Sequence, residues 1–286
     1  MKSKKHIFIF TLVLVCALLS SALPTYANIY LSTYDEATLS GLTFEDGDIV
    51  RHDPNTDTTT VIFSESSITP YNTIFAPNVD AIHILNNGNI ILSTLFIGTL
   101  GGLEFQSSDL VEYNPATDTA TLFFDGSDHF VGNLFYPDID AAHVLDNGNL
   151  ILSTKYEANI GGLLFEDGDL FEYNPTTRVA SLFFDEDLLD KDDNVNGVYV
   201  VDEDNIILTV ESCISTSLAG VPIQRGDLVS YNFSTNTASI YFSMPCENID
   251  AVYLSGSGVV PEPSTLILLG TGLLGAGIFK RKRVKR

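Results

Sequence analysis

The chain has 286 residues, of which 14 are basic and 37 acidic, giving a formal net charge of −23, and it contains three Cys and no Trp. Between the two terminal segments described below, five basic residues stand against 36 acidic ones, a formal charge of about −31. A surface this acidic repels nucleic acids and anionic lipid headgroups, which excludes nucleic-acid binding, and it favours divalent cations, cationic partners or simple solubility.

The N-terminal segment has the pattern of a secretory signal peptide. Three lysines, Lys2, Lys4 and Lys5, precede an apolar stretch over residues 7–19. Thr25-Tyr26-Ala27 then supplies a small-residue cleavage site. We therefore expect residues 1–27 to direct export, and the mature chain to begin at Asn28.

The body of the chain is built from four internal copies. A polar-to-apolar step recurs at intervals of 61, 60 and 58 residues, with its aspartate at Asp48, Asp109, Asp169 and Asp227. A second landmark recurs in each copy at Val79-Asp80-Ala81, Ile139-Asp140-Ala141, Val195-Asn196-Gly197 and Ile249-Asp250-Ala251.

Each copy reads as two β-hairpins. The first covers residues 81–94 around Asn86-Asn87-Gly88-Asn89, and Asn-Gly between apolar runs is a strong hairpin signal. The second covers residues 109–124 around Asn114-Pro115, where Asn and Pro favour a turn. Helical periodicity is almost absent, so the copies predict four strands each in an all-β fold.

The ends of the body indicate how the copies are arranged. Residues 28–33 match the second strand of a copy, and residues 250–254 match the first. The C-terminal strand can therefore complete the first sheet, which removes exposed edges. The sequence thus predicts a four-bladed β-propeller closed by pairing of the N- and C-terminal strands, with a stacked sandwich or solenoid of the same strands as the alternative.

Polar residues at equivalent places in the copies are the candidate site. Fourfold geometry would gather Asp80, Asp140, Asn196 and Asp250, and such oxygen ligands suit a hard cation such as Ca²⁺. Capping of loops by backbone N–H groups is the other reading of these four residues, and the favoured one. Turn formation is also expected of Asp48 and its equivalents. Connections over residues 95–108, 155–168 and 211–226 within copies are expected to be long loops on the functional face.

A second set of equivalent positions holds His83, His143, Tyr199 and Tyr253. Two imidazoles replaced by two phenols indicate inward packing rather than a metal site. No Ser-His-Asp set, phosphate-binding glycine loop or CxxC pair is present in the sequence.

Two cysteines, Cys213 and Cys246, remain in the exported body. In an oxidising compartment such a pair predicts a disulfide, which would stabilise the fold by roughly 3 to 4 kcal/mol. The other reading is two unpaired thiols.

The C-terminal segment combines Pro261-Glu262-Pro263, an apolar run over residues 266–279 and six basic residues within 280–286. This order resembles the PEP-CTERM sorting signal of bacterial secreted proteins. The resemblance implies export, recognition by an exosortase-type enzyme, transient membrane anchoring, and delivery to the cell surface or an exopolysaccharide matrix. A single-pass anchor is the alternative for this segment.

These observations divide the chain into a signal peptide (1–27), a propeller-like repeat domain (28–258) and a sorting and anchor segment (259–286) with a membrane helix. They favour a non-enzymatic binding or structural protein of the cell envelope or extracellular matrix, with exopolysaccharide or surface proteins as partners. An extracellular carbohydrate-active enzyme is the alternative, since carboxylate pairs for glycoside hydrolysis can hide among so many acids.

Overall fold

A computed structural model describes residues 26–72, 76–132, 137–191, 193–211 and 215–255. Contacts within the chain separate one compact unit, Asn28–Ser255, from the terminal segments. This unit is all-β with three short helical turns, as the sequence predicts. The predicted signal peptide, except Tyr26 and Ala27, and the predicted membrane helix lie outside the described residues, as does Cys213.

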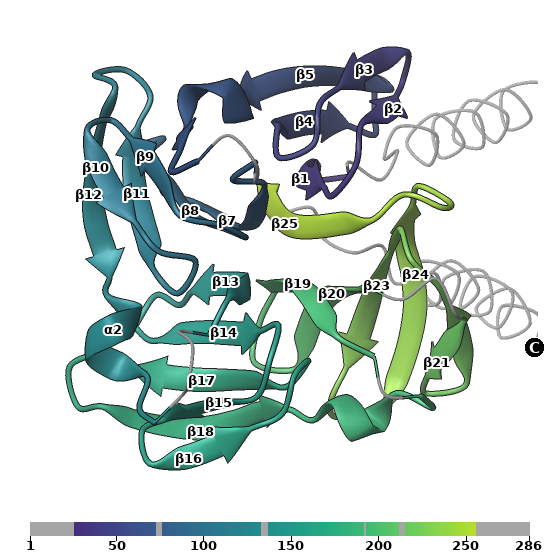
Figure 1. The fold of residues 1–286 in the computed structure, drawn as a ribbon. Helices are drawn as coiled ribbons and strands as arrows, with labels where there is room; N and C mark the ends of the chain where they lie inside the picture. Colours follow the sequence, from purple (N-terminus) through teal and green to yellow (C-terminus); the bar gives the residue numbers. More distant parts are fainter. Residues whose placement is uncertain (1–25, 73–75, 133–136, 192, 212–214, 256–286) are drawn as a thin grey trace, which may run out of the picture. The chain divides into compact units, whose positions relative to one another are not determined.

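Four antiparallel sheets of four strands form the unit (Figure 1). Sheet 1, in spatial order, contains β25 (Ile249–Ser255), β1 (Asn28–Thr33), β4 (Ile49–Asp53) and β5 (Thr58–Phe63). Sheet 2 contains β7 (Val79–Ile84), β8 (Ile90–Thr94), β11 (Leu110–Asn114) and β12 (Thr119–Phe124). Sheet 3 contains β13 (Ile139–Val144), β14 (Leu150–Thr154), β17 (Leu170–Asn174) and β18 (Val179–Phe184). Sheet 4 contains β19 (Val195–Val200), β20 (Asn205–Val210), β23 (Asp227–Asn232) and β24 (Thr237–Ser243).

The first sheet joins the two ends of the body. β1 pairs antiparallel with β25 from Asn28 opposite Ser255 to Thr33 opposite Ile249. In the other three sheets the first two strands are joined by a turn, and in sheets 2 and 3 this turn contains the predicted Asn-Gly step. Gly88 has φ of 85° there, a backbone conformation that a side chain disfavours.

The first strands of the four sheets, β25, β7, β13 and β19, each contact the first strands of two neighbouring sheets. Contacts also cross between β13 and β25 and between β7 and β19, so the four strands surround a common centre (Figure 1).

The hydrophobic core lies between adjacent sheets. Between sheets 2 and 3, Leu110 and Phe124 pack in one cluster with Leu152 and Phe171. Equivalent clusters fill the spaces between sheets 3 and 4 and between sheets 1 and 2. β8 and β14 are buried along their whole length, whereas the fourth strands β12 and β18 are largely exposed.

The predicted long loops contain further structure, which corrects the sequence interpretation. Each carries a two-stranded ribbon of three-residue strands, too short to show a hydrophobic period. Four such pairs occur in the described chain: β2 (Ala37–Leu39) with β3 (Leu42–Phe44), β9 (Gly98–Leu100) with β10 (Leu103–Phe105), β15 (Ala158–Ile160) with β16 (Leu163–Phe165), and β21 (Thr216–Leu218) with β22 (Val221–Ile223). Strand β6 (Thr69–Pro70) joins β9, and the connections between sheets hold the turns η1 (Glu65–Ser67), α2 (Gly126–His129) and η2 (Glu186–Leu188).

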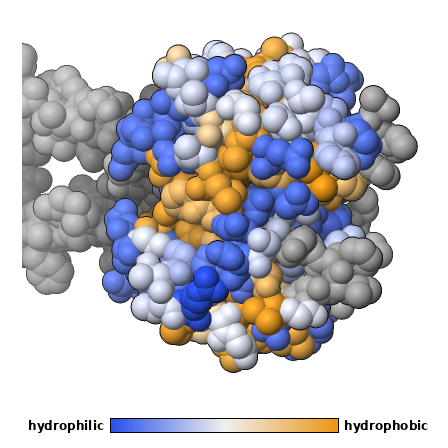
Figure 2. Space-filling view, turned by 60° about the vertical axis from the view of Figure 1, so that its left-hand side comes forward, coloured by the Kyte–Doolittle hydropathy of each residue, from blue (hydrophilic) through white to orange (hydrophobic). Residues whose placement is uncertain are grey.

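Figure 2 shows one face, where hydrophobic residues gather between hydrophilic regions. Separately, a groove of about 980 Å³ is lined by exposed apolar side chains, including Val131, Tyr156 and Leu164.

Candidate functional site

The four residues predicted to gather at one end of the sheets share a backbone irregularity. In sheet 2, Val79 pairs with Thr94 and Ala81 with Ser93, so Asp80 between them has no partner in β8. The same one-residue skip leaves out Asp140, Asn196 and Asp250 in the other sheets. Such β-bulges redirect a side chain and are frequent beside functional sites. We call Asp80, Asp140, Asn196 and Asp250 the bulge residues.

All four bulge residues are buried, with exposed fractions of 5%, 4%, 3% and 4% in chain order. Among the described residues, neither carboxylate oxygen of Asp80 or Asp250 has a hydrogen-bond partner, and one oxygen of Asp140 and the amide oxygen of Asn196 also lack one. The other Asp140 oxygen accepts from Asn194 Nδ2 at 2.7 Å. Buried polar atoms are normally hydrogen-bonded, so these oxygens need a partner that the described protein atoms do not supply, such as a water molecule or an ion.

A second set of polar residues, two positions before each bulge residue, lies beside the first. We call Asn78, Asp138, Asn194 and Asn248 the preceding residues, and the two sets together the central cluster. The backbone carbonyl of each preceding residue accepts a hydrogen bond from the backbone N–H of the residue that follows the second strand of a sheet, with N···O distances of 2.9 to 3.0 Å. The donors are Leu95, Lys155, Glu211 and Tyr34. The sequence interpretation missed this set, although the triplet Asn/Asp–Val/Ile–Asp/Asn recurs in all four copies.

The central cluster encloses a cavity of about 20 Å³, lined by all four bulge residues, three of the preceding residues, and Tyr34, Leu95, Lys155 and Glu211. This volume admits about one water molecule or one small ion. The space is therefore small and lined mainly by polar residues.

Electrostatics make the unpaired carboxylates costly when ionised. Burial raises the pKa of the Asp80 and Asp250 carboxyls well above their usual range, and at Asp80 nearby carboxylates including Asp138 add to the effect. Burial raises the pKa of Asp140 to about 7, although Asn194 and Lys155 oppose the shift. Positive charge within the cavity would offset the cost of ionising these groups.

Lys155 supplies the one positive side chain that lines the cavity. Its Nζ lies 3.0 Å from Glu211 Oε1, so it is paired with a carboxylate outside the cluster. Burial alone would lower the pKa of Lys155, but the contact with Glu211 and the charges of Asp140 and Asp138 together raise it. One lysine, already shared with Glu211, does not balance four buried aspartates.

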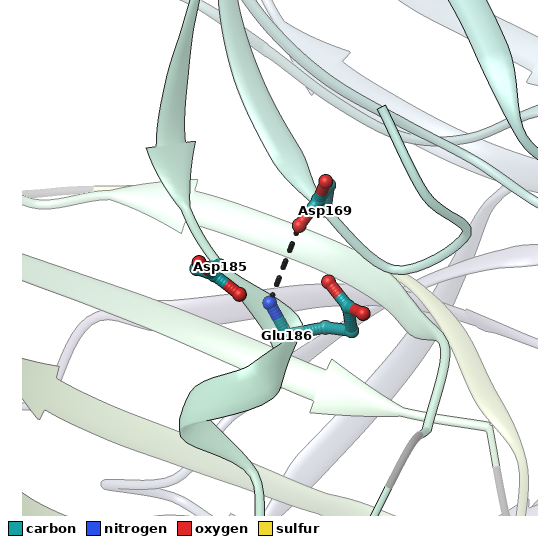
Figure 3. A group of neighbouring side chains, drawn as sticks. All are labelled: Asp169, Asp185 and Glu186. Atoms are coloured by element: carbon teal, nitrogen blue, oxygen red, sulfur yellow. Dashed lines mark hydrogen bonds between the residues drawn. The ribbon is translucent and has the colours of Figure 1, made fainter. Parts of the chain in front are cut away.

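A different acidic group lies against sheet 3. Asp169, Asp185 and Glu186 offer carboxylate oxygens that all lie within 4.8 Å of one another, the single such trio found in the described ranges (Figure 3). The carboxylate oxygens of Asp80, Asp140 and Asp250 do not all come within 4.8 Å of one another.

The contacts of the Figure 3 group are those of a turn. Asp169 accepts the Glu186 backbone N–H at 3.3 Å, and Asp185 caps η2 by accepting the Asp187 N–H at 3.0 Å. Burial, with Asp169 beside it, raises the pKa of Glu186 to about 8. The group carries no second sign of a ligand.

The residues equivalent to Asp169 also act in turns. Each accepts a backbone N–H from the residue three positions before it, at 2.8 to 3.3 Å. Asp48 and Asp109 accept a second backbone N–H from the connection to the next sheet, and Asp227 accepts from Ser243 Oγ. These contacts satisfy the carboxylates.

The His and Tyr positions form a closed set of ring contacts. Edge-to-face contacts join His83 to His143, His143 to Tyr199, Tyr199 to Tyr253 and Tyr253 to His83, with centroid distances of 4.8, 5.0, 5.3 and 5.1 Å. This is a favourable aromatic geometry. Burial lowers the pKa of His83 to about 4 and of His143 to about 3, so both imidazoles are neutral near pH 7.

Cys246 is exposed with its thiol free in the structure. Because Cys213 lies outside the described residues, the disulfide stays a prediction.

Several solved structures similar to this chain come from Bacteroides species. One is described as the extracellular domain of a one-component system of B. thetaiotaomicron (12% identity, TM-score 0.35, covering 81% of this chain and 38% of that chain). Others are an auxiliary nutrient-binding protein of B. thetaiotaomicron (9%, 0.33, 79% and 42%) and a protein of unknown function from B. caccae (9%, 0.31, 77% and 73%). The chain spans less than half the length of the first two, and likeness at this level carries no functional argument. No curated protein sequence matches the chain.

The C-terminal segment gives a specific match. The family model for the PEP-CTERM protein-sorting motif matches residues 259–283, which include Pro261, Glu262 and Pro263. Such a motif implies an exported protein that is transiently anchored in the membrane and processed by an exosortase. Within the described ranges no helix has the length and apolar character needed to cross a membrane. The chain therefore carries a PEP-CTERM protein-sorting motif.

Proposed function

We propose that this protein is a non-enzymatic binding or structural module of the cell surface or extracellular matrix. Residues 1–27 act as its signal peptide, 28–258 as the exported body, and 259–286 as the segment that an exosortase recognises. The sorting motif supports export, and the separation of Asn28–Ser255 as one compact unit supports these divisions.

The body acts as a closed four-bladed β-propeller. Pairing of β1 with β25 and the contacts of each first strand with two neighbours support this arrangement. Closed β architectures protect their edges from pairing with other chains, which suits a protein displayed outside the cell.

The central cluster binds one divalent cation, with Ca²⁺ as the best match to its oxygen ligands. The observation that carries this proposal is the set of buried, unpaired oxygens at four equivalent β-bulges. Loop capping, the other reading, is disfavoured because capping would pair these oxygens with backbone N–H groups, as it does at Asp109. Repetition of like groups in four sheets also fits ion binding better than catalysis, which needs unlike groups in set roles.

The residues available suggest how the ion is held. Asp80, Asp140 and Asp250 supply charge, Asn196 supplies an amide oxygen, and Asp138 is the one charged member of the preceding residues. Since the cavity has room for about one small ion, the body binds one equivalent, held by side-chain oxygens.

Calorimetric titration of CaCl₂ into the purified body tests this proposal. We expect one site per body, a rise in melting temperature, and loss of binding in Asp140→Asn. The matched control is Asp167→Asn, which removes an exposed carboxylate and should bind as the wild type does. Equal binding by Asp140→Asn, or no heat and no change in melting temperature, would contradict the ion site.

Incubation of the body with the producer's own exopolysaccharide tests the non-enzymatic assignment. We expect no new reducing ends in the polysaccharide. Turnover would replace the binding module with the carbohydrate-active enzyme considered above.

A further inference from the structure

A cavity of about 800 Å³ opens where the first strands of sheets 2, 3 and 4 end and their turns begin. The side chains of His83, His143, Tyr199 and Tyr253, which contact one another edge to face, line it. On each strand these rings stand three residues after a bulge residue, so the cavity is separate from the central cluster. All residues that line it are within the described ranges.

The imidazoles in this cavity have different hydrogen-bond states. His83 Nδ1 accepts the Val144 backbone N–H at 3.2 Å, so a neutral His83 carries its proton on Nε2. His143 is 8% exposed, and among the described residues its ring nitrogens have no hydrogen-bond partner. Because a neutral imidazole has one nitrogen with a lone pair, His143 offers an acceptor to a donor that enters the cavity.

The walls of the cavity carry negative charge and no positive charge. Asp146, Glu172, Asp202 and Glu203 line it, and none of its lining residues is Lys or Arg. One carboxylate oxygen of Glu172 accepts a hydrogen bond from Asn149 Nδ2, and one of Asp202 accepts the Asp204 backbone N–H at 2.9 Å. Each carboxylate therefore keeps a second oxygen for a ligand. Asp146 and Glu203 are exposed and have no hydrogen-bond partner in the described chain.

The charged groups come from sheets 3 and 4 alone. Asn86, in the turn of sheet 2, occupies the position that Asp146 has in the turn of sheet 3. Leu145 and Phe183 add apolar surface to the same side. Unlike the central cluster, this cavity therefore breaks the equivalence of the copies, as a specific ligand site does.

We propose that this cavity binds an organic cation that carries primary ammonium groups on an aliphatic chain. The ammonium groups donate to the wall carboxylates and to the His143 acceptor, and the methylene groups contact Leu145 and Phe183. An ammonium group donates several hydrogen bonds at once, and charge-assisted hydrogen bonds are stronger than neutral ones. Free polyamines and lysine side chains share this chemistry.

Calorimetric titration of spermidine and of N-acetyl-lysine amide into the body, in EDTA and 150 mM NaCl, tests the proposal. We expect spermidine to bind with one site, and NMR signals of the His143 ring to shift on binding. Binding of the lysine derivative as well would identify peptide side chains as a source, and its failure would identify free polyamines. If neither compound binds, the proposal is wrong.

A pair of double variants separates a local site from general attraction to an acidic protein. Asp146→Asn with Glu203→Gln removes two wall charges, and Glu45→Gln with Asp167→Asn removes two exposed charges elsewhere. Because the wall variant removes two acceptors for the ammonium groups, it should bind spermidine about tenfold more weakly. The control should change less than about twofold. Equal losses in both, or binding of neutral oligosaccharides in place of the amines, would overturn the proposal.

Discussion

Asp140→Asn should stabilise the cation-free protein above neutral pH. The pKa of the Asp140 carboxyl is about 7 in the folded chain, against an ordinary value of 3.8 for an aspartate. Between these values the folded state holds a proton that the unfolded state has lost, so the free energy of unfolding falls as pH rises through this window, and the full Asp140 penalty is present above about pH 7. The difference of roughly three units corresponds to about 4 kcal/mol. An amide avoids this cost and keeps an oxygen for the Asn194 Nδ2 bond.

Urea unfolding at several pH values, in EDTA and in CaCl₂, measures the effect. In EDTA at pH 8 the variant should exceed the wild type by up to about 4 kcal/mol, and the two should converge near pH 4. With Ca²⁺ at 100 times its Kd, the wild type should gain about 2.7 kcal/mol and the variant less. A variant that is destabilised equally in EDTA and CaCl₂, with an unchanged pH slope, would refute this reasoning.

Three further changes test other parts of the account. Asn196→Asp adds a fourth carboxylate to the bulge residues and should tighten Ca²⁺ binding about tenfold by calorimetry, and weaker binding would count against direct ligation. Asp109→Ala leaves the Gln106 and Gly126 N–H groups without their acceptor and should cost about 1 to 3 kcal/mol in urea unfolding, with Ca²⁺ affinity unchanged. Truncation after Asn248 removes β25 from sheet 1 and should abolish cooperative unfolding, whereas a truncated body that unfolds as sharply as the full one would show that β1 does not need this partner.

The sequence predicts the strands well because local signals define them. The Asn-Gly turns mark the first hairpins, and apolar runs such as 90–92 mark strands buried on both faces. The match of residues 28–33 to a second strand predicts the pairing of β1 with β25, since the missing strand must come from the other chain end.

The site was only partly predictable. Repeat alignment selected the bulge residues, but the bulges depend on strand register, which a single copy does not reveal. The pairing of each oxygen is also a tertiary property: Asp109 and Asp80 look alike in sequence, yet one carboxylate is satisfied by backbone N–H groups and the other is not. The preceding residues were visible as a repeated triplet and were missed because only the second polar position was aligned.

The most direct test of the ion site is an anomalous difference map from crystals of the body grown with CaCl₂. We expect one peak inside the central cluster, about 2.3 to 2.6 Å from oxygens of Asp80, Asp140 or Asp250. A map without a peak there, or with calcium only beside Asp169, Asp185 and Glu186, would contradict the account.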